Sequence, residues 1–328
     1  MSIILSFPRL ICSSLLMSVA LLASAASAAE FGSGPVRMVV PFSPGGSTDL
    51  VARHMAKKLA TAIGQTVVVE NISGGGTVVG MQSVISAPSD GNTLILTGGG
   101  SFTVMRHTTR GMSFDPLLAL TPITLVNTLP HWLVVRADRP ESTFREFFEM
   151  IKKNPGKVSI SVNALGGAAH LGILNWAKDN GLDLTVVPYR GSSAAMLDLL
   201  GGSTTAHVDV VGSTMSHVTG GKAKALSLLQ ATPLADFPKF AAAPPKNLGG
   251  LYVRGDHVLA VKSGTSVPTI NRIYEDIRKI MLEPDFLELL RGLGYEPLSI
   301  TPAEAKKSLE RDSDYYREIV RSTNITVN

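Results

Sequence analysis

The fold is decided by one stretch of the sequence, Val36 to Asn71, which reads VRMVVPFSPGGSTDLVARHMAKKLATAIGQTVVVEN. A β-branched run at 36–42 is followed by a helix-like stretch at 49–63 and by a second β-branched run at 66–70. A strand, a helix and a strand in this order form the unit from which mostly parallel sheets are built. The stretch therefore predicts an α/β fold.

The same alternation continues along most of the chain. Further helix-like stretches lie at 79–86, 144–154, 170–180 and 194–200, and further strand-like runs lie at 93–97, 132–136, 158–162, 185–188, 208–211 and 258–261. Helical stretches follow the last of these runs to the end of the chain. We expect two mostly parallel sheets, each flanked by helices, in two domains.

The N-terminus has the layout of a secretory signal peptide. One early charge, Arg9, precedes an apolar run from Leu10 to Ala23, and small residues follow it. This run is shorter than the roughly 20 residues that a membrane-spanning helix needs. We therefore expect cleavage after Ala28, with cleavage after Ala25 as the alternative, and export to the periplasm. Cleavage removes the only cysteine, which excludes disulfides and cysteine chemistry from the mature protein.

The charges of the chain are nearly balanced. There are 30 Lys and Arg against 26 Asp and Glu, and the basic residues are scattered instead of grouped. This pattern is typical of a solvated surface and argues against a nucleic-acid partner.

The loop PFSPGGSTDL, Pro41 to Leu50, joins the first strand to the first helix. Gly45 and Gly46 allow a close turn, and Ser47 or Thr48 can cap the helix. The free N–H groups and the positive dipole end of a helix bind anions. An ordinary tight turn with an N-cap explains this loop equally well.

Three more loops of this kind follow predicted strands. They are NALGGAAHLG at 163–172, PYRGSS at 188–193, where Ser192 is placed to cap a helix, and GSTMSH at 212–217. Ligands of open α/β sheets bind outside the carboxyl ends of the strands, where such loops lie. Four loops divided between two domains indicate two walls of one cleft that present amides and hydroxyls to a carboxylate.

Motifs for catalysis, cofactors and metals do not occur in the sequence. The glycines of NISGGGTVVG at 71–80 lack the GxGxxG spacing, and there is no GxSxG or GxxxxGK[ST] motif. None of the seven histidines has the HExxH spacing of a metal site. His170 can orient its glycine loop or touch an anion, and a structural histidine bonded to the backbone explains it equally well. Arg190 is more readily a solvated side chain than a carboxylate partner.

The opening stretch from Val36 to Asn71 closely resembles that of the tripartite tricarboxylate transporter receptors, also called Bug-type binding proteins. Further matching pieces follow in the order of that family: GMQSVISAPSDGNTLIL, NPGKVSISVNALGGAAHLG, VPYRGSSAAMLDLLGG, HVDVVGS and LRGLGYEPLSITPAEAKKSLERD. The resemblance covers essentially the whole chain after the signal peptide.

The resemblance implies a type II periplasmic binding fold with the ligand cleft between two α/β domains and no enzymatic activity. We expect domain 1 at 29–135 plus 228–328 and domain 2 at 136–227. We also expect a monomer without a cofactor or metal that captures a small organic carboxylate and delivers it to membrane transporter subunits. A sensor protein in place of the transporter, or an exported α/β hydrolase with Ser47 or Ser101 as nucleophile, are the alternatives.

The same resemblance implies which residues bind the ligand. They are Phe42, Ser43, Pro44, Gly45, Gly46, Ser47 and Thr48 in the first domain, Asn163, Ala164, Gly166, Gly167, Ala168 and His170 in the second, and Tyr189, Gly191 and Ser213 nearby. Several positions depart from the family pattern, among them Arg190 in place of a typical Lys, an apparent insertion at 203–206 and two longer segments. Residues 72–77 read ISGGGT where family members commonly carry RPGAGG, and residues 251–263 match a Trp-containing family segment poorly. These departures leave the identity of the carboxylate open.

Overall fold

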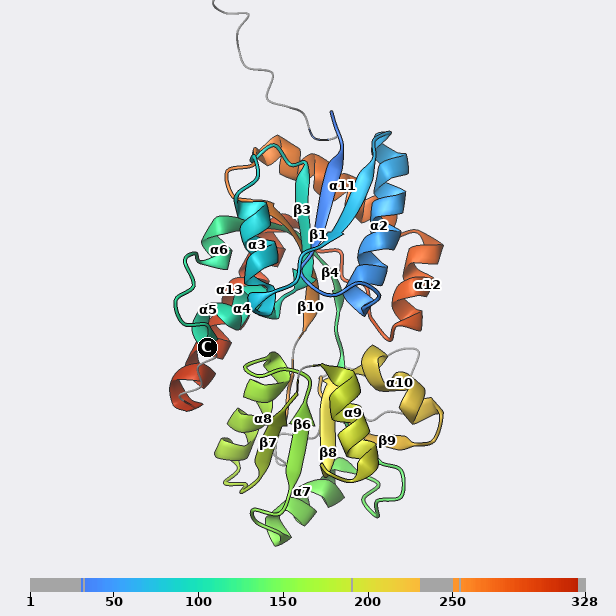
Figure 1. Cartoon of the computed structure of the whole chain (residues 1–328), viewed down its shortest axis with the longest axis vertical. Helices are drawn as coiled ribbons and strands as arrows, with labels where there is room; N and C mark the ends of the chain where they lie inside the picture. The colour runs from blue at the N-terminus through green and yellow to red at the C-terminus, as the bar shows by residue number, and fades with distance from the viewer. Residues whose placement is uncertain (1–30, 32, 190, 231–249, 254, 324–328) are drawn as a thin grey trace, which may run out of the picture.

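A computed structural model describes residues 31, 33–189, 191–230, 250–253 and 255–323. The expected signal peptide, its cleavage site and Arg190 lie outside the described residues. The chain forms two lobes, one above the other in Figure 1, and each lobe contains a five-stranded sheet with helices against it. The expected two-domain α/β architecture is confirmed.

The sheet of the first lobe has the strand order β2-β1-β3-β10-β4. Its strands are β1 (Val36–Val40), β2 (Val67–Asn71), β3 (Thr93–Gly98), β4 (Leu120–Thr128) and β10 (Asp256–Lys262). β1 pairs in parallel with β2 and with β3, whereas β10 is antiparallel to both β3 and β4. β4 therefore runs in the direction of the first three strands, and the sheet is mostly parallel.

The helices of the first lobe cover both faces of this sheet. They are α2 (Ser47–Ile63), α3 (Val78–Ile85), α4 (Gly100–Thr103), α5 (Met105–Thr108), α6 (Pro116–Ala119), α11 (Val267–Met281), α12 (Pro284–Gly292) and α13 (Pro302–Thr323), with the 3-10 turn η1 (Gly75–Thr77) before α3.

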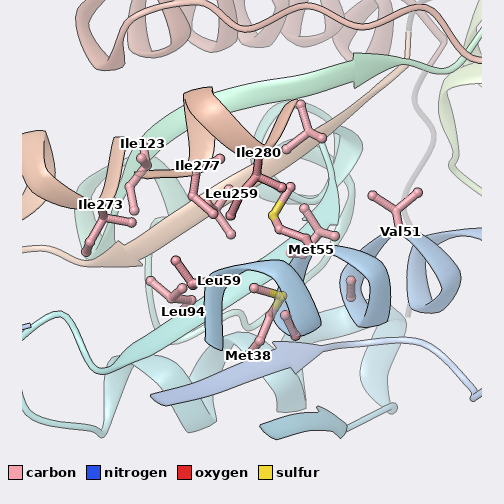
Figure 2. Close-up of a cluster of buried hydrophobic side chains, with 14 of the residues drawn as sticks. Met38, Val51, Met55, Leu59, Leu94, Ile123, Leu259, Ile273, Ile277 and Ile280 are labelled. Atoms are coloured by element: carbon pink, nitrogen blue, oxygen red, sulfur yellow. The ribbon is translucent and has the colours of Figure 1, made fainter. Parts of the chain in front are cut away.

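The main core of the first lobe lies between the sheet and helices α2 and α11 (Figure 2). Val51, Met55 and Leu59 are spaced at three to four residues, so one face of α2 carries them all. These side chains are fully buried in the same cluster as Met38 of β1 and Leu94 of β3. Helix α2 is therefore fixed on the sheet, with its first residue close to the end of β1.

The second lobe repeats this strand pattern, in the order β7-β6-β8-β5-β9. Its strands are β5 (His131–Arg136), β6 (Ser159–Val162), β7 (Thr185–Pro188), β8 (Ala206–Val210) and β9 (Ala223–Leu228), and its helices are α7 (Phe144–Lys153), α8 (Ala168–Asp179), α9 (Ser192–Gly201) and α10 (Val211–Thr219). β5 is antiparallel to both β8 and β9, while β6 is parallel to β7 and β8. Four of the five strands therefore share one direction here as well.

The chain passes between the lobes at positions that differ from the expected boundaries. The boundary expected between residues 135 and 136 falls inside β5, all of which pairs in the second sheet. The expected return at 228 is also too early, because Leu251 and Val253 belong to the core of the second lobe. We propose one crossing at 129–130, where β4 leads into β5, and a second between the described residues Val253 and Asp256, where the chain returns to β10.

Candidate ligand-binding cleft

A cavity of about 840 Å³ lies between the two lobes. Its lining comes from the segments that follow β1, β3 and β6, and from residues near the crossings such as Leu129 and His131. The carboxyl ends of parallel strands from both sheets therefore meet at this cavity, which is where α/β proteins bind ligands.

The loop between β1 and α2 is held in place by Asp49. This buried carboxylate accepts hydrogen bonds from the Gly45 amide at 2.9 Å, from Asn71 Nδ2 at 2.9 Å and from Arg53 Nε at 2.9 Å. Burial by itself raises the pKa of Asp49, but the hydrogen bonds from Arg53, Gly45 and Asn71 outweigh it and keep the pKa below its ordinary value. Gly45 has a φ of 81°, a conformation that favours glycine at this turn.

Helix α2 begins without a side-chain cap. Its N-cap residue is Gly46, so Ser47 is the first helical residue and does not cap the helix, contrary to one of the sequence expectations. Thr48 does not cap it either. Its hydroxyl lies 2.9 Å from Nε2 of the buried His257, whose Nδ1 lies 3.0 Å from Asn127 Oδ1. Burial lowers the pKa of His257 to about 3, so the ring is neutral and accepts the Thr48 hydrogen bond.

Helix α8 begins in the same way in the second lobe. Its N-cap residue is Gly167, which has no side chain to bond the free amides of the first turn. His170 Nδ1 accepts a 2.9 Å hydrogen bond from the Gly166 amide, and burial lowers the pKa of this histidine. His170 is therefore a structural histidine bonded to the backbone of its glycine loop, which it helps to orient, and it lies outside the cavity lining.

A buried polar chain supports the start of the same loop. Asn163 Nδ2 donates to Asp209 Oδ1 at 2.7 Å, and the other oxygen of Asp209 lies 3.1 Å from His207 Nε2. His207 and Asp209 are both fully buried. Nδ1 of His207 in turn lies 3.0 Å from the carbonyl oxygen of Ser161. The two buried side chains therefore fix Asn163 at the wall of the cavity.

The structure places the expected binding residues in two groups. Those that line the cavity are Phe42, Ser43, Asn163, Ala164, Gly166, Gly167 and Ala168. Those that lie outside its lining are Pro44, Gly45, Gly46, Ser47, Thr48, His170, Tyr189, Gly191 and Ser213. Most residues of the second group lie just before or within the first turns of helices α2, α8, α9 and α10.

The third loop, after β7, is shaped by Tyr189. Its hydroxyl donates a 2.5 Å hydrogen bond to Asp198, and this bond raises the pKa of Tyr189 to about 12. Gly191 is the N-cap residue of α9 and Ser192 is its first helical residue, so the expected cap by Ser192 is wrong. Ser213 lies in the first turn of α10, which also lacks a side-chain cap.

Several cavity residues were missed by the sequence reasoning. They come from the turns at 73–78, 98–101 and 108–113 and from Asp256 at the start of β10. A buried chain of hydroxyls, Thr97 to Ser101 to Thr77, with 3.0 Å between neighbours, holds two of these turns together. Gly99 and Gly100 directly follow β3, and glycines after a strand are the sequence signal that could have indicated the turn at 98–101.

Four helices that each follow a strand start without a side-chain cap, as does α12 of the first lobe. The outer helices α7 and α11 have side-chain caps, from Thr143 and Ser266. Helices α2, α8, α9 and α10, which each follow a strand of a mostly parallel sheet, have none. Uncapped first turns leave N–H donors and a positive dipole end, which is the arrangement that binds anions such as carboxylates.

No helix in the described part of the chain is both long and apolar enough to cross a membrane. Two mostly parallel α/β lobes with a cavity between them, and with uncapped helices in each lobe, are the architecture of a two-lobed solute-binding protein.

Comparison with known proteins gives the family. The model of the tripartite tricarboxylate transporter family receptor matches residues 51–325. The chain belongs to this family of solute-binding receptors.

Individual relatives match nearly the whole chain. A UPF0065 protein of Bordetella pertussis is 34% identical over 84% of this chain and 85% of its own length, and BugT of the same organism is 27% identical over 92% and 93%. The solved structure of periplasmic binding protein BugD has a TM-score of 0.76 at 29% identity, and the match covers 89% of this chain and 98% of that one. A structure described as a periplasmic transporter has a TM-score of 0.79 at 28% identity, over 90% and 99%.

Proposed function

We propose that this protein binds a small organic carboxylate in the cleft between its lobes and delivers it to membrane subunits of a tripartite tricarboxylate-type transporter, without converting it chemically. The observation that carries the proposal is the start of α8, where Gly166, Gly167 and Ala168 line the cavity and no side chain caps the helix. Helix α2 offers a second uncapped start in the other lobe, beside Phe42 and Ser43 of the lining. Membership of a receptor family supports the same function.

The site acts through geometry and charge. A carboxylate at the start of α8 accepts hydrogen bonds from first-turn amides and interacts favourably with the dipole of the helix. When the ligand also contacts the loop at α2, it has a higher affinity for the closed arrangement of the lobes than for the open one. Binding then shifts the population toward the closed form, which is the form that we propose the membrane subunits recognise.

We also propose that the protein works in the periplasm. The support is the signal-like sequence of residues 1–28 and the description of BugD, a relative of the same fold, as a periplasmic binding protein. Fractionation of cells that express the full chain tests this. Protein in the periplasmic fraction that begins at Ala29 is the expected result, and intact Met1 in the cytoplasm would contradict it.

Proline substitutions at the helix starts test the carboxylate site. Proline at the first helical position removes one N–H and is well tolerated there. Both Gly46 and Gly167 have the extended conformation that a following proline requires. A lost hydrogen bond to a charged group costs about 1.5–3 kcal/mol, so Ser47→Pro and Ala168→Pro should each weaken carboxylate binding by about tenfold or more.

Two matched variants control for other effects. Ser47→Ala removes the hydroxyl and keeps the amide, and Val267→Pro places proline at the first position of α11, outside the cleft. Calorimetric titration with an acid found by a thermal-shift screen of organic carboxylates should show near-normal affinity for both. Equal affinities of the wild type and both cleft proline variants would rule out the amide site.

A further inference from the structure

The cavity has a large apolar surface in addition to its glycine-rich turns. Val78, Val104, Met105 and Met112 contribute to it from the first lobe, and Leu165 contributes from the second. Leu165 lies in the same loop as the uncapped start of α8 and is 51% exposed. An apolar side chain exposed inside a cavity is a common feature of ligand sites, where it packs against the apolar part of a bound molecule.

The apolar surface is held in place by its surroundings. The sulfur of Met105 lies 3.2 Å from the Thr77 hydroxyl, which also contacts Ser101. Val104 is 3% exposed and belongs to a small apolar cluster with Leu171 of α8 and Ile319 of α13. Ala168, the first residue of α8, packs against this cluster as well.

This packing sets the direction in which a ligand extends. Since Ala168 and Val104 share one cluster, the amides of the α8 start lie next to the apolar surface. A carboxylate bound there would place the rest of its molecule against Val104, Met105 and Leu165.

Fixed charges are few in the described part of the cavity lining. Among the described residues of its lining, Arg110 is the only Lys or Arg, and it is exposed, while Asp256 is the only Asp or Glu. His131 adds no positive charge, because burial lowers its pKa and leaves the ring neutral at pH 7. A second ionised carboxylate that lay against Val104, Met105 and Leu165 would lose hydration, and these side chains offer it no hydrogen bond.

We infer that the preferred ligand is a monocarboxylate with an apolar body, the size of an aromatic ring or a branched alkyl chain, that lies between Leu165 and the surface formed by Val104, Met105 and Met112. This inference rests on the proposed carboxylate-binding function and specifies its substrate class. The acid end occupies the start of α8, and the apolar body is removed from water.

Matched pairs of acids test the inference on the purified protein. Hexanoate is compared with adipate, benzoate with terephthalate, and cyclohexanecarboxylate with cyclohexane-1,4-dicarboxylate, by thermal shift and calorimetry. Within the pair that binds best, the monocarboxylate should bind about tenfold more tightly or better, because a second carboxylate against the apolar side chains loses hydration and gains no hydrogen bond from them.

Two cavity variants make the test specific. Leu165→Ala should weaken the ring or branched acid by about tenfold, since it removes apolar contact with the ligand body. Met112→Lys should shift the preference toward the dicarboxylate, because it adds a cation at the apolar surface. Leu118→Lys is the control, since Leu118 lies on α6, is 76% exposed and does not line the cavity, and it should leave the preference unchanged.

The outcomes separate the inference from the proposed function. Tighter binding of the dicarboxylates, with no effect of Leu165→Ala, would overturn the inference and leave the carboxylate-binding function standing. Absence of a response to every acid would overturn both.

Discussion

At the scale of single residues, Asp49 links the stability of the protein to the shape of its ligand site. It binds the Gly45 amide in the turn before α2 and Asn71 at the end of β2. Both hydrogen bonds are accepted by oxygens of the Asp49 carboxylate, so both depend on its ionised form. A change at Asp49 therefore affects the fold and the cleft together.

We predict that Asp49→Asn destabilises the protein at pH 7 by about 1–3 kcal/mol, because hydrogen bonds to a charged acceptor are lost or weakened. The folded-state pKa of Asp49 lies below the ordinary value of 3.8. Its stabilising contribution is therefore present above that value and is lost as the pH falls through the folded pKa. Urea unfolding at pH 7 and pH 3 should show a smaller difference between variant and wild type at the lower pH, and an equal difference at both would contradict this role.

The residues around the helix starts show what the sequence can and cannot predict at this scale. The glycine loops at 41–50 and 163–172 were found because they follow strands and precede helices. The caps assigned to Ser47 and Ser192 were wrong, because Gly46 and Gly191 take the N-cap conformation one position earlier. Glycine and serine are both favoured at the N-cap position, so the sequence does not tell which of two neighbours is the N-cap residue. Only the backbone angles do.

At the scale of elements, a glycine contact joins α10 of the second lobe to the end of α12 of the first. A Cβ atom at Gly212 would overlap the carbonyl oxygen of Leu293, and one at Gly294 would lie 2.8 Å from Val211 Cγ1. Figure 1 shows α10 directly below α12, across the gap between the lobes. This contact requires glycine because the two backbones approach closely.

We predict that Gly212→Ala hinders this approach of the lobes and weakens ligand binding by about tenfold, since overpacking of a tight contact costs about 1–3 kcal/mol. Gly292→Ala is the matched control, because a Cβ atom there meets no other atom within 4 Å. Calorimetry measures the affinity, and the melting temperature without ligand shows whether each variant is folded. A folded Gly212→Ala protein with unchanged affinity would contradict a role of this contact in closure.

The elements that the sequence predicted are those with a strong local pattern. The strands β1, β2, β3, β6 and β7 were found within two residues because they are β-branched and precede turns or helices. β9 was missed because AKALSL has no β-branched residue, and it forms a strand only by pairing with β5. β4 was missed because it contains Pro122, which is unusual inside a strand.

At the scale of the whole molecule, the two lobes have the same strand pattern and share the cavity between them. Helix α13 of the first lobe also packs against α8 of the second through Tyr316 and Ile319. The two-lobed architecture was predicted from the strand and helix alternation. The position where the chain crosses between the lobes was not predicted, because β5 follows β4 closely in the sequence. Only the pairing of β5 with β8 and β9 assigns β5 to the second sheet.

In the proposed function, backbone amides at the starts of α2 and α8 hold a carboxylate in the cleft. The most direct test is an amide NMR titration of the 15N-labelled protein with the acid that gives the largest thermal shift. We predict that the amides of Ser47, Thr48, Ala168 and Ala169 shift together with increasing acid and saturate at the affinity measured by calorimetry. Saturable binding that leaves these amides unperturbed and shifts amides elsewhere would contradict the account.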